Sequence, residues 1–126
     1  MDLEARIIHE ISTSPFNRGL CGADWLAEPR NVVVMVDDGF ALFDFLGGGL
    51  YAIHLFLRSR GKNAVVDVRQ ITDTMFRNGA QMIVGHIPVI NRRAAVIGRM
   101  AGYHYAGRET TPYGDVLVYL IAPETH

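Results

Sequence analysis

A short basic stretch near the middle of the chain has the residue types that bind phosphate. It reads Arg58-Ser59-Arg60-Gly61-Lys62-Asn63-Ala64 and lies between a predicted strand and a predicted helix. The first turn of a helix presents free backbone N–H groups and a partial positive charge, which suit an anion. Gly61 lets the backbone approach a ligand closely, and Arg58, Arg60 and Lys62 add positive charge. A basic turn of this kind is equally often a solvated loop, so the residues alone leave both interpretations open.

Several other sites can be excluded from spacing. The stretch lacks the Gly-Lys-Ser/Thr ending of a P-loop and two of the three glycines of a dinucleotide fingerprint. The histidines show neither His-x-His nor His-x-x-x-His spacing, and Cys21 is the only cysteine. One thiol cannot form an internal disulfide or a cysteine-built zinc site. We therefore expect no metal centre, and we interpret Cys21 as a small, partly buried side chain.

Composition indicates one globular domain without a polyanionic partner. The chain has 126 residues, of which 49% are hydrophobic and 20% charged, with a formal net charge of −1. This balance predicts a packed core and gives no broad attraction to nucleic acid or to a membrane. The N-terminus carries charges where a signal peptide would be apolar, and no apolar run approaches the ~20 residues of a membrane span. We expect a cytoplasmic protein.

The elements that must position the basic stretch follow from hydrophobic periodicity. The pattern predicts an amphipathic helix over Leu3–Ile11, with a strand as the alternative, and then a loop to Pro29 with one helical turn at Ala23–Ala27. An Asp-Gly turn and a triple glycine separate three strands, and two helices end at glycines. The predicted strands are Asn31–Val36, Phe40–Leu46, Leu50–Leu57, Gln81–Val89, Tyr103–Glu109 and Asp115–Ile121, and the predicted helices are Ala64–Asn78 and Asn91–Ala101.

This order of elements predicts the fold class. A strand, a helix and a strand in succession form a parallel pair joined by a crossover, and the flanking hairpins are antiparallel. The expected fold is therefore α/β (α+β), a mixed and mostly antiparallel sheet with a central parallel pair, in a single domain over residues 1–126.

Two motifs resemble those of the GNAT (Gcn5-related N-acetyltransferase) superfamily. Arg60-Gly61-Lys62 matches the start of its acetyl-CoA loop, where Asn63 replaces a usual glycine. Asn91–Tyr103 is similar to its following helix, with Asn first and Gly-aromatic last. The resemblance covers residues 31–121 in order and is closest to ribosomal-protein N-terminal acetyltransferases and short phage-encoded relatives.

The resemblance implies an acetyl-CoA-binding core at 31–121, behind a shortened N-terminal region at 1–30 that walls the acceptor side. In such a fold the strands Leu50–Leu57 and Gln81–Val89 separate, and the pantetheine arm of acetyl-CoA pairs in the gap. A backbone N–H near Leu55 would polarise the thioester carbonyl. The residues expected to bind acetyl-CoA are Leu55, Leu57, Arg58, Arg60, Gly61, Lys62, Asn63, Ala64 and Asn91.

Acetyl transfer also needs groups that move protons. His54 is the first candidate base, because its strand leads into the loop and histidine titrates near neutral pH. A histidine packed on a sheet face is an equally good interpretation. His86, on the neighbouring strand, is the second candidate, and a packed histidine is the favoured interpretation there. Many members of the family protonate the thiolate with a tyrosine at the position of Gly98, so Tyr113 on a turn, another tyrosine or water would have to replace it.

Three functions remain open on this basis. The first is an acetyl-CoA-dependent N-acetyltransferase acting on a primary amine of a protein or small molecule. The second is a GNAT-like structural or interaction protein that keeps CoA binding with weak or no catalysis, which the glycine at position 98 favours. The third is a nucleotide-binding domain that uses the same loop. Small domains of this family often pair, so a homodimer is one alternative. Trp25 and Phe16 either wall the acceptor site or belong to the core.

Overall fold

A computed structural model describes residues 2–13 and 21–125, and in this part the chain forms one mixed sheet with helices on both faces. The helices are α1 (Leu3–Thr13), α2 (Gly22–Ala27), α3 (Gly61–Arg77) and α4 (Arg92–Met100), followed by a 3-10 turn at Pro123–Thr125. The strands are β1 (Val32–Val36), β2 (Gly39–Gly47), β3 (Leu50–Leu57), β4 (Met82–Pro88), β5 (His104–Thr111) and β6 (Gly114–Ile121). None of the described helices is long and apolar enough to cross a membrane.

The six strands are arranged in the order β1-β2-β3-β4-β6-β5. Only β3 and β4 are parallel, and the other neighbours are antiparallel. The expected mixed sheet with one central parallel pair is therefore confirmed. The helix predicted over Leu3–Ile11 is also confirmed, and α1 extends to Thr13.

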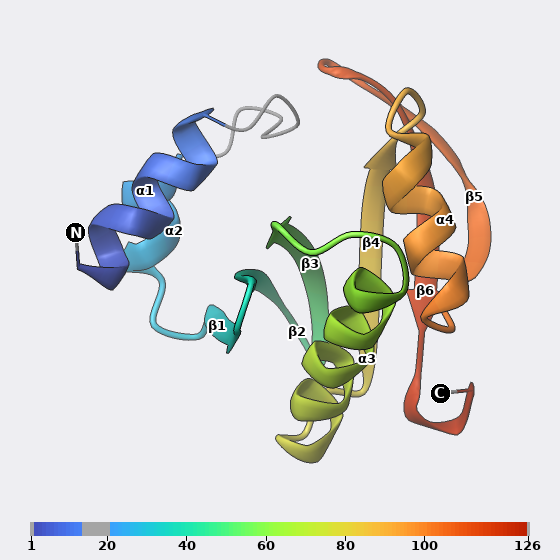
Figure 1. Ribbon diagram of the computed structural model, residues 1–126, viewed down its shortest axis with the longest axis horizontal. Coiled ribbons are helices and arrows are strands. Elements are labelled where there is room, and N and C mark those ends of the chain that lie inside the picture. Colours follow the sequence, from blue (N-terminus) through green and yellow to red (C-terminus); the bar gives the residue numbers. More distant parts are fainter. Residues whose placement is uncertain (1, 14–20, 126) are drawn as a thin grey trace.

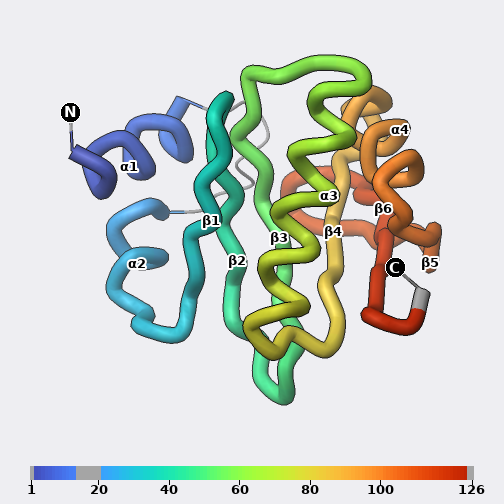
Figure 2. The backbone as a smooth tube through the Cα atoms, turned by 60° about the horizontal axis from the view of Figure 1, so that its bottom comes forward, coloured from blue at the N-terminus to red at the C-terminus, as the bar shows by residue number. Residues whose placement is uncertain are grey.

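Helices α3 and α4 pack on one face of the sheet, and α1 and α2 lie at the β1 end and pack on the other face there (Figures 1 and 2). Alternation along the strands sends one set of side chains toward α3 and α4 and the other toward α1 and α2. The larger core joins Phe43 of β2, Ile83 of β4 and Ile71 of α3, all fully buried. The smaller core joins Ile7 and Ile11 of α1 with Trp25, Phe40 and Leu42. This second core places Trp25 inside the molecule, whereas Phe16 lies outside the described residues.

The β1–β2 hairpin requires glycine at its corner. Gly39 has φ +153°, and a Cβ at this position would lie 2.1 Å from the carbonyl oxygen of Phe56. The close approach lets Asp38 O accept a hydrogen bond from Arg58 N at 2.8 Å. The hairpin corner is thereby tied to the end of β3, where the basic stretch begins.

Helix α3 begins three residues earlier than its apolar pattern indicates. The amide of Ala64 donates to Arg60 O, so the first turn covers residues 61–63, which face solvent and carry no periodic signal. Helix α4 begins as expected, because the Asn91 side chain accepts a hydrogen bond from Ala94 N and caps it.

A buried hydroxyl pair ties α3 to the start of β5. Thr72 Oγ1 and Tyr103 Oη lie 2.8 Å apart, and both side chains are buried. Replacing Tyr103 with Phe leaves the Thr72 hydroxyl without its partner, so we expect the free energy of unfolding to fall by about 1–3 kcal/mol. Urea denaturation of Tyr103→Phe and of the double variant with Thr72→Val measures this. The double variant should be the more stable of the two, and equal or lower stability would contradict the assignment.

Candidate active site

The central parallel strands separate, as the resemblance to GNAT proteins implied. Their register runs from Leu50–Met82 to Ile53–Gly85 and stops there, although β3 continues to Leu57 and β4 to Pro88. A pocket of about 140 Å³ opens at this point. It is lined by residues 53–56 of β3, residues 85–88 of β4, and Asn91, Ala94 and Gly98 at α4.

The first turn of α3 lies beyond the end of β3 and is not capped by a side chain. Arg60 precedes it in an extended conformation, and Gly61 has φ +56°, a left-handed value that favours glycine. Among the described residues, none accepts a hydrogen bond from the amides of Gly61, Lys62 or Asn63. Such amides point outward along the helix axis and can bind an anion.

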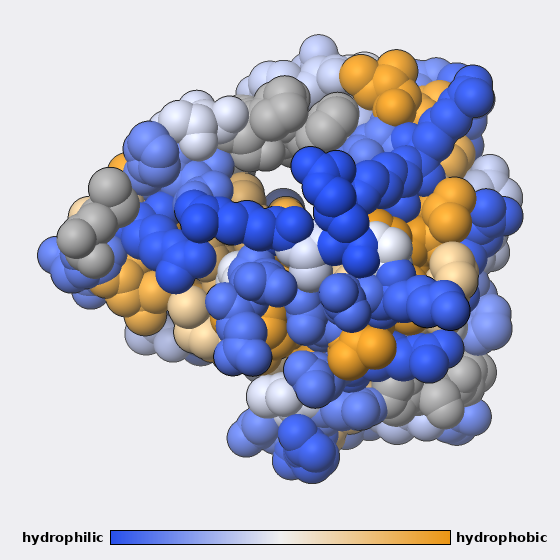
Figure 3. Space-filling view, in the orientation of Figure 1, coloured by the Kyte–Doolittle hydropathy of each residue, from blue (hydrophilic) through white to orange (hydrophobic). Residues whose placement is uncertain are grey.

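Two side chains hold this loop in shape. Ser59 is buried, and its Oγ donates to Asp67 Oδ2 of α3 at 2.6 Å. Its carbonyl oxygen accepts from Arg93 Nη2 of α4 at 2.7 Å. The loop is thus joined to both helices, and Gly61, Lys62 and Arg93 line a groove between them. Arg58 points elsewhere, toward Glu10 of α1 at 3.6 Å. In Figure 3, hydrophilic side chains cover much of the surface over α3 and border a hollow between α3 and the N-terminal helices.

His54 lies on the opposite sheet face from α3 and contacts a carboxylate. Its Nε2 is 2.7 Å from Asp44 Oδ2, and both side chains are somewhat more than one-quarter exposed. With Asp44 ionised, Nε2 carries the hydrogen, which leaves Nδ1 as the proton acceptor. The other oxygen, Asp44 Oδ1, accepts a hydrogen bond from the indole Nε1 of Trp25. The carboxylate is therefore held on one side by an indole and on the other by an imidazole.

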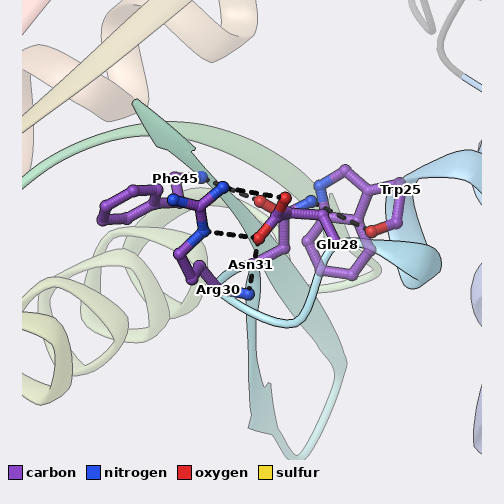
Figure 4. Close-up of polar contacts among 5 residues, drawn as sticks. All are labelled: Trp25, Glu28, Arg30, Asn31 and Phe45. Carbon is purple, nitrogen blue, oxygen red and sulfur yellow. Dashed lines mark hydrogen bonds and ion pairs between the residues drawn. The ribbon is translucent and has the colours of Figure 1, made fainter. Parts of the chain in front are cut away.

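Trp25 is itself fixed by the connection between α2 and β1 (Figure 4). Asn31 Nδ2 donates to Trp25 O at 3.0 Å, and Asn31 Oδ1 accepts from Phe45 N at 2.8 Å. Arg30 covers the ring of Phe45 and binds Glu28 with Nε at 2.7 Å. The hydrogen bond from Arg30 lowers the pKa of Glu28 to about 2, so Glu28 stays ionised near neutral pH. These contacts anchor the indole next to Asp44.

His86 lies on the same sheet face as His54 and lines the same pocket. Both are two residues beyond the Ala52–Val84 pair, so they occupy the two edges of the gap. His86 Nε2 is 3.9 Å from Glu109 Oε2 of β5. Each histidine thus has a carboxylate on the side away from the gap.

Some of the remaining candidate residues line the pocket and others do not. Leu55 lines the pocket and is 37% exposed, whereas Leu57 packs against the larger core. Tyr113 lies on the turn between β5 and β6, is 68% exposed, and does not line this pocket. Tyr103 does line it, but burial raises the pKa of this tyrosine above the ordinary value, only partly offset by the hydrogen bond with Thr72.

Comparison with known proteins supports a single fold. No model of a known protein family matches the chain, and no curated protein matches it. Among solved structures, aminoglycoside acetyltransferase AAC(6')-Ib in complex with coenzyme A superimposes with a TM-score of 0.63 at 18% identity, over 74% of this chain and 65% of that chain. The chain has the GNAT acyltransferase fold.

Other structures of this fold give the same result. Spermidine N-acetyltransferase from Vibrio cholerae, in complex with CoA and spermine, has a TM-score of 0.62 at 17% identity, over 70% of this chain and 59% of that one. Ribosomal-protein-S5-alanine acetyltransferase from Vibrio fischeri has a TM-score of 0.60 at 14% identity, over 71% and 56%. The chain spans slightly less than two thirds of the length of the aminoglycoside acetyltransferases.

Within this GNAT fold, the residue that sequence reasoning missed is Asp44, together with the hydrogen bond that Trp25 donates to it. One signal was available, since Asp44 is the only charged residue in the otherwise apolar strand Gly39–Gly47. Among the described residues, no group of three or more His, Cys, Asp or Glu side chains is arranged to hold a metal ion.

Proposed function

We propose that this chain binds acetyl-CoA as a cosubstrate and transfers the acetyl group to a primary amine. One observation carries the proposal: β3 and β4 separate directly beside a helix whose first-turn amides are uncapped. A gap between strands offers unpaired backbone groups to an extended, amide-containing chain such as pantetheine. Amides at a helix N-terminus suit its diphosphate. In this chain the gap and the helix N-terminus are joined by the short loop between β3 and α3.

The binding roles follow from the position of each group. The amides of Gly61, Lys62 and Asn63 would hold the diphosphate, and Lys62 and Arg93 would add charge from the groove between α3 and α4. The pantetheine arm would lie in the pocket past Asn91, whose side chain already caps α4. Backbone N–H groups of β3 beyond Ile53, including that of Leu55, would polarise the thioester carbonyl.

His54 would act as the general base from the acceptor side of the sheet. The amine must lose a proton when it attacks the thioester, and a histidine suits this task near neutral pH. Asp44 would fix the ring and stabilise the imidazolium that forms, since it lies 2.7 Å from Nε2. Trp25 would keep the carboxylate in place through its indole N–H.

The solved structures with this fold support an amine as the acceptor class. They include complexes with kanamycin and with spermine, both of which carry amino groups. For this chain the acceptor is a primary amine on a small molecule or a protein.

A calorimetric titration combined with a thiol-release assay tests the proposal. We expect acetyl-CoA and CoA to bind, ATP not to compete, and free thiol to appear when acetyl-CoA and a primary amine are present together. Binding without thiol release across a panel of amines would favour a CoA-binding module without catalysis, consistent with the glycine at position 98. Binding of ATP alone would favour the nucleotide-binding alternative.

A further inference from the structure

Two buried tyrosines line the pocket, and they differ in whether the hydroxyl has a partner. Tyr103 and Tyr119 are each 5% exposed. The hydroxyl of Tyr103 pairs with that of Thr72 at 2.8 Å. No described residue forms a hydrogen bond with the hydroxyl of Tyr119, whose ring meets that of Tyr105 edge-on, with 5.7 Å between the centroids. Buried polar groups are normally hydrogen-bonded, because an unpartnered one lowers stability, so a bound ligand is the natural partner for this hydroxyl.

The position of Tyr119 in the sheet places it next to the gap. Tyr119 of β6 pairs with Gly85 of β4, and Gly85 pairs with Ile53 of β3 in the last parallel pair before the strands separate. Gly85 and Gly98 line the pocket together with Tyr119 but contribute no side chain. Within 4 Å, an added Cβ would meet only Ile53 Cγ2 at the first glycine and only Ile87 Cδ1 at the second. The pocket therefore connects Tyr119 with the point where the strands separate.

We propose that the Tyr119 hydroxyl donates a hydrogen bond to the sulfur of bound CoA and stabilises the thiolate that leaves during the reaction. This inference rests on the proposed acetyl transfer. Tyr119 belongs to the larger core on the α3 face of the sheet, whereas His54 lies on the opposite face. A thioester in the gap would therefore have the base on one side and this hydroxyl on the other. Because burial strengthens a hydrogen bond to a charged group, the hydroxyl suits a developing negative charge.

The bond changes balance without a further reactant. The amine nitrogen attacks the thioester carbon, a C–N bond forms, and His54 removes the proton from nitrogen. The C–S bond breaks with its electron pair moving to sulfur, and the thiolate forms while hydrogen-bonded to Tyr119. The products are the N-acetylated amine and the CoA thiolate, which takes a proton from solvent while His54 releases its own proton to solvent. Tyr119 keeps its proton throughout, so its role is to stabilise charge.

The binding of CoA and desulfo-CoA tests this contact directly. Desulfo-CoA carries hydrogen in place of the thiol group, so it lacks only the sulfur. At about pH 9 an ordinary thiol is mostly ionised, and a hydrogen bond to a charged group adds about 10-fold or more to affinity. We expect CoA to bind the wild-type protein more tightly than desulfo-CoA does, and this preference to fall about 10-fold in Tyr119→Phe. Calorimetric titration of each protein with each compound gives the four affinities.

Kinetics and stability of Tyr119→Phe complete the test. We expect kcat to fall about 100-fold, the size of effect seen when one hydrogen bond to a developing charge is removed. The midpoint of urea unfolding should stay the same or rise, in contrast to Tyr103→Phe, because no partner is lost in the free protein. Tyr105→Phe is the matched control, since Tyr105 is 59% exposed and lies outside the pocket lining. It should keep the wild-type kcat and the full preference for CoA.

Three results would overturn the role of Tyr119. They are an unchanged kcat in Tyr119→Phe, an unchanged preference for CoA over desulfo-CoA, and a lower midpoint of urea unfolding, which would show that the hydroxyl is already partnered within the protein. Failure of the underlying proposal has a different signature, in which the wild-type protein itself releases no thiol or binds neither compound.

Discussion

His54→Gln is expected to lower kcat for acetyl transfer by about 100- to 10,000-fold, the usual contribution of a general base. Glutamine fills similar space and keeps a hydrogen-bonding group near Asp44, but it cannot accept a proton from the amine at neutral pH. The affinity for CoA should stay unchanged, because His54 lies on the sheet face away from the α3 amides. Steady-state kinetics and calorimetry on the same preparation measure both quantities.

Asp44→Asn should also lower kcat, but by less, up to about 100-fold, because a catalytic group that is held in the wrong position still retains some activity. An asparagine can turn its amide toward His54 and hold the wrong nitrogen protonated. Thermal unfolding of each variant must match that of the wild-type protein within a few degrees. A wild-type kcat in His54→Gln would contradict the role of His54 as general base, but it would not contradict the proposed binding of CoA.

Gly61→Val is expected to weaken CoA binding by about 10- to 100-fold. A Cβ at Gly61 meets nothing within 4 Å, so the effect comes from the backbone. Valine at φ +56° is strained by ~1–3 kcal/mol. If the backbone rotates to relieve the strain, the amides of the first turn of α3 no longer converge on the diphosphate. Calorimetric titration with CoA gives the affinity.

Gly79→Val is the matched control at the opposite end of the same helix. Gly79 has φ +100° and also leaves open space around an added Cβ. Both substitutions should therefore lower the free energy of unfolding by about the same 1–3 kcal/mol, while only Gly61→Val lowers CoA affinity. Equal affinities in the two variants would mean that the start of α3 does not hold the ligand.

The strands of the sheet could be predicted from the sequence because the turn residues that separate them are neighbours in the chain. Asp37 and Asp38 form the turn between β1 and β2, which begins at Gly39. The glycines 47–49 reverse the chain before β3, with a bulge between Phe45 and Gly47. The start of α3 was less readable, since periodicity marks only the buried side chains and Gly61, Lys62 and Asn63 are exposed. Hydrophobic periodicity therefore cannot locate a first helical turn whose side chains are all exposed.

The contacts of the site depend on tertiary structure and were harder to foresee. Asp44 pairs with Ala52 across the β2–β3 hairpin, and His54 is its diagonal neighbour, so the contact depends on the bulge at Gly47. Without that bulge the register shifts by one, and Asp44 would face the other side of the sheet. Trp25 reaches Asp44 from a helix 19 residues earlier in the chain. Residues 14–20 before it, which include Phe16, lie outside the described residues.

His86 and Glu109 illustrate the same difficulty. They belong to β4 and β5, which are separated by β6 in the sheet although β5 precedes β6 in the chain. Local patterns placed both strands correctly but carried no information on which side chains would meet. The pairing of a histidine with a carboxylate on each edge of the gap followed only once the strand order was known.

The central claim is that the space between β3 and β4 and the head of α3 together receive CoA. A crystal structure of the protein with CoA tests it most directly. We predict electron density for the diphosphate against the amides of Gly61, Lys62 and Asn63, and for the pantetheine arm past Asn91 with its sulfur between His54 and His86. Well-ordered CoA bound anywhere else on the molecule, with the gap empty and the first turn of α3 in contact only with solvent, would contradict it.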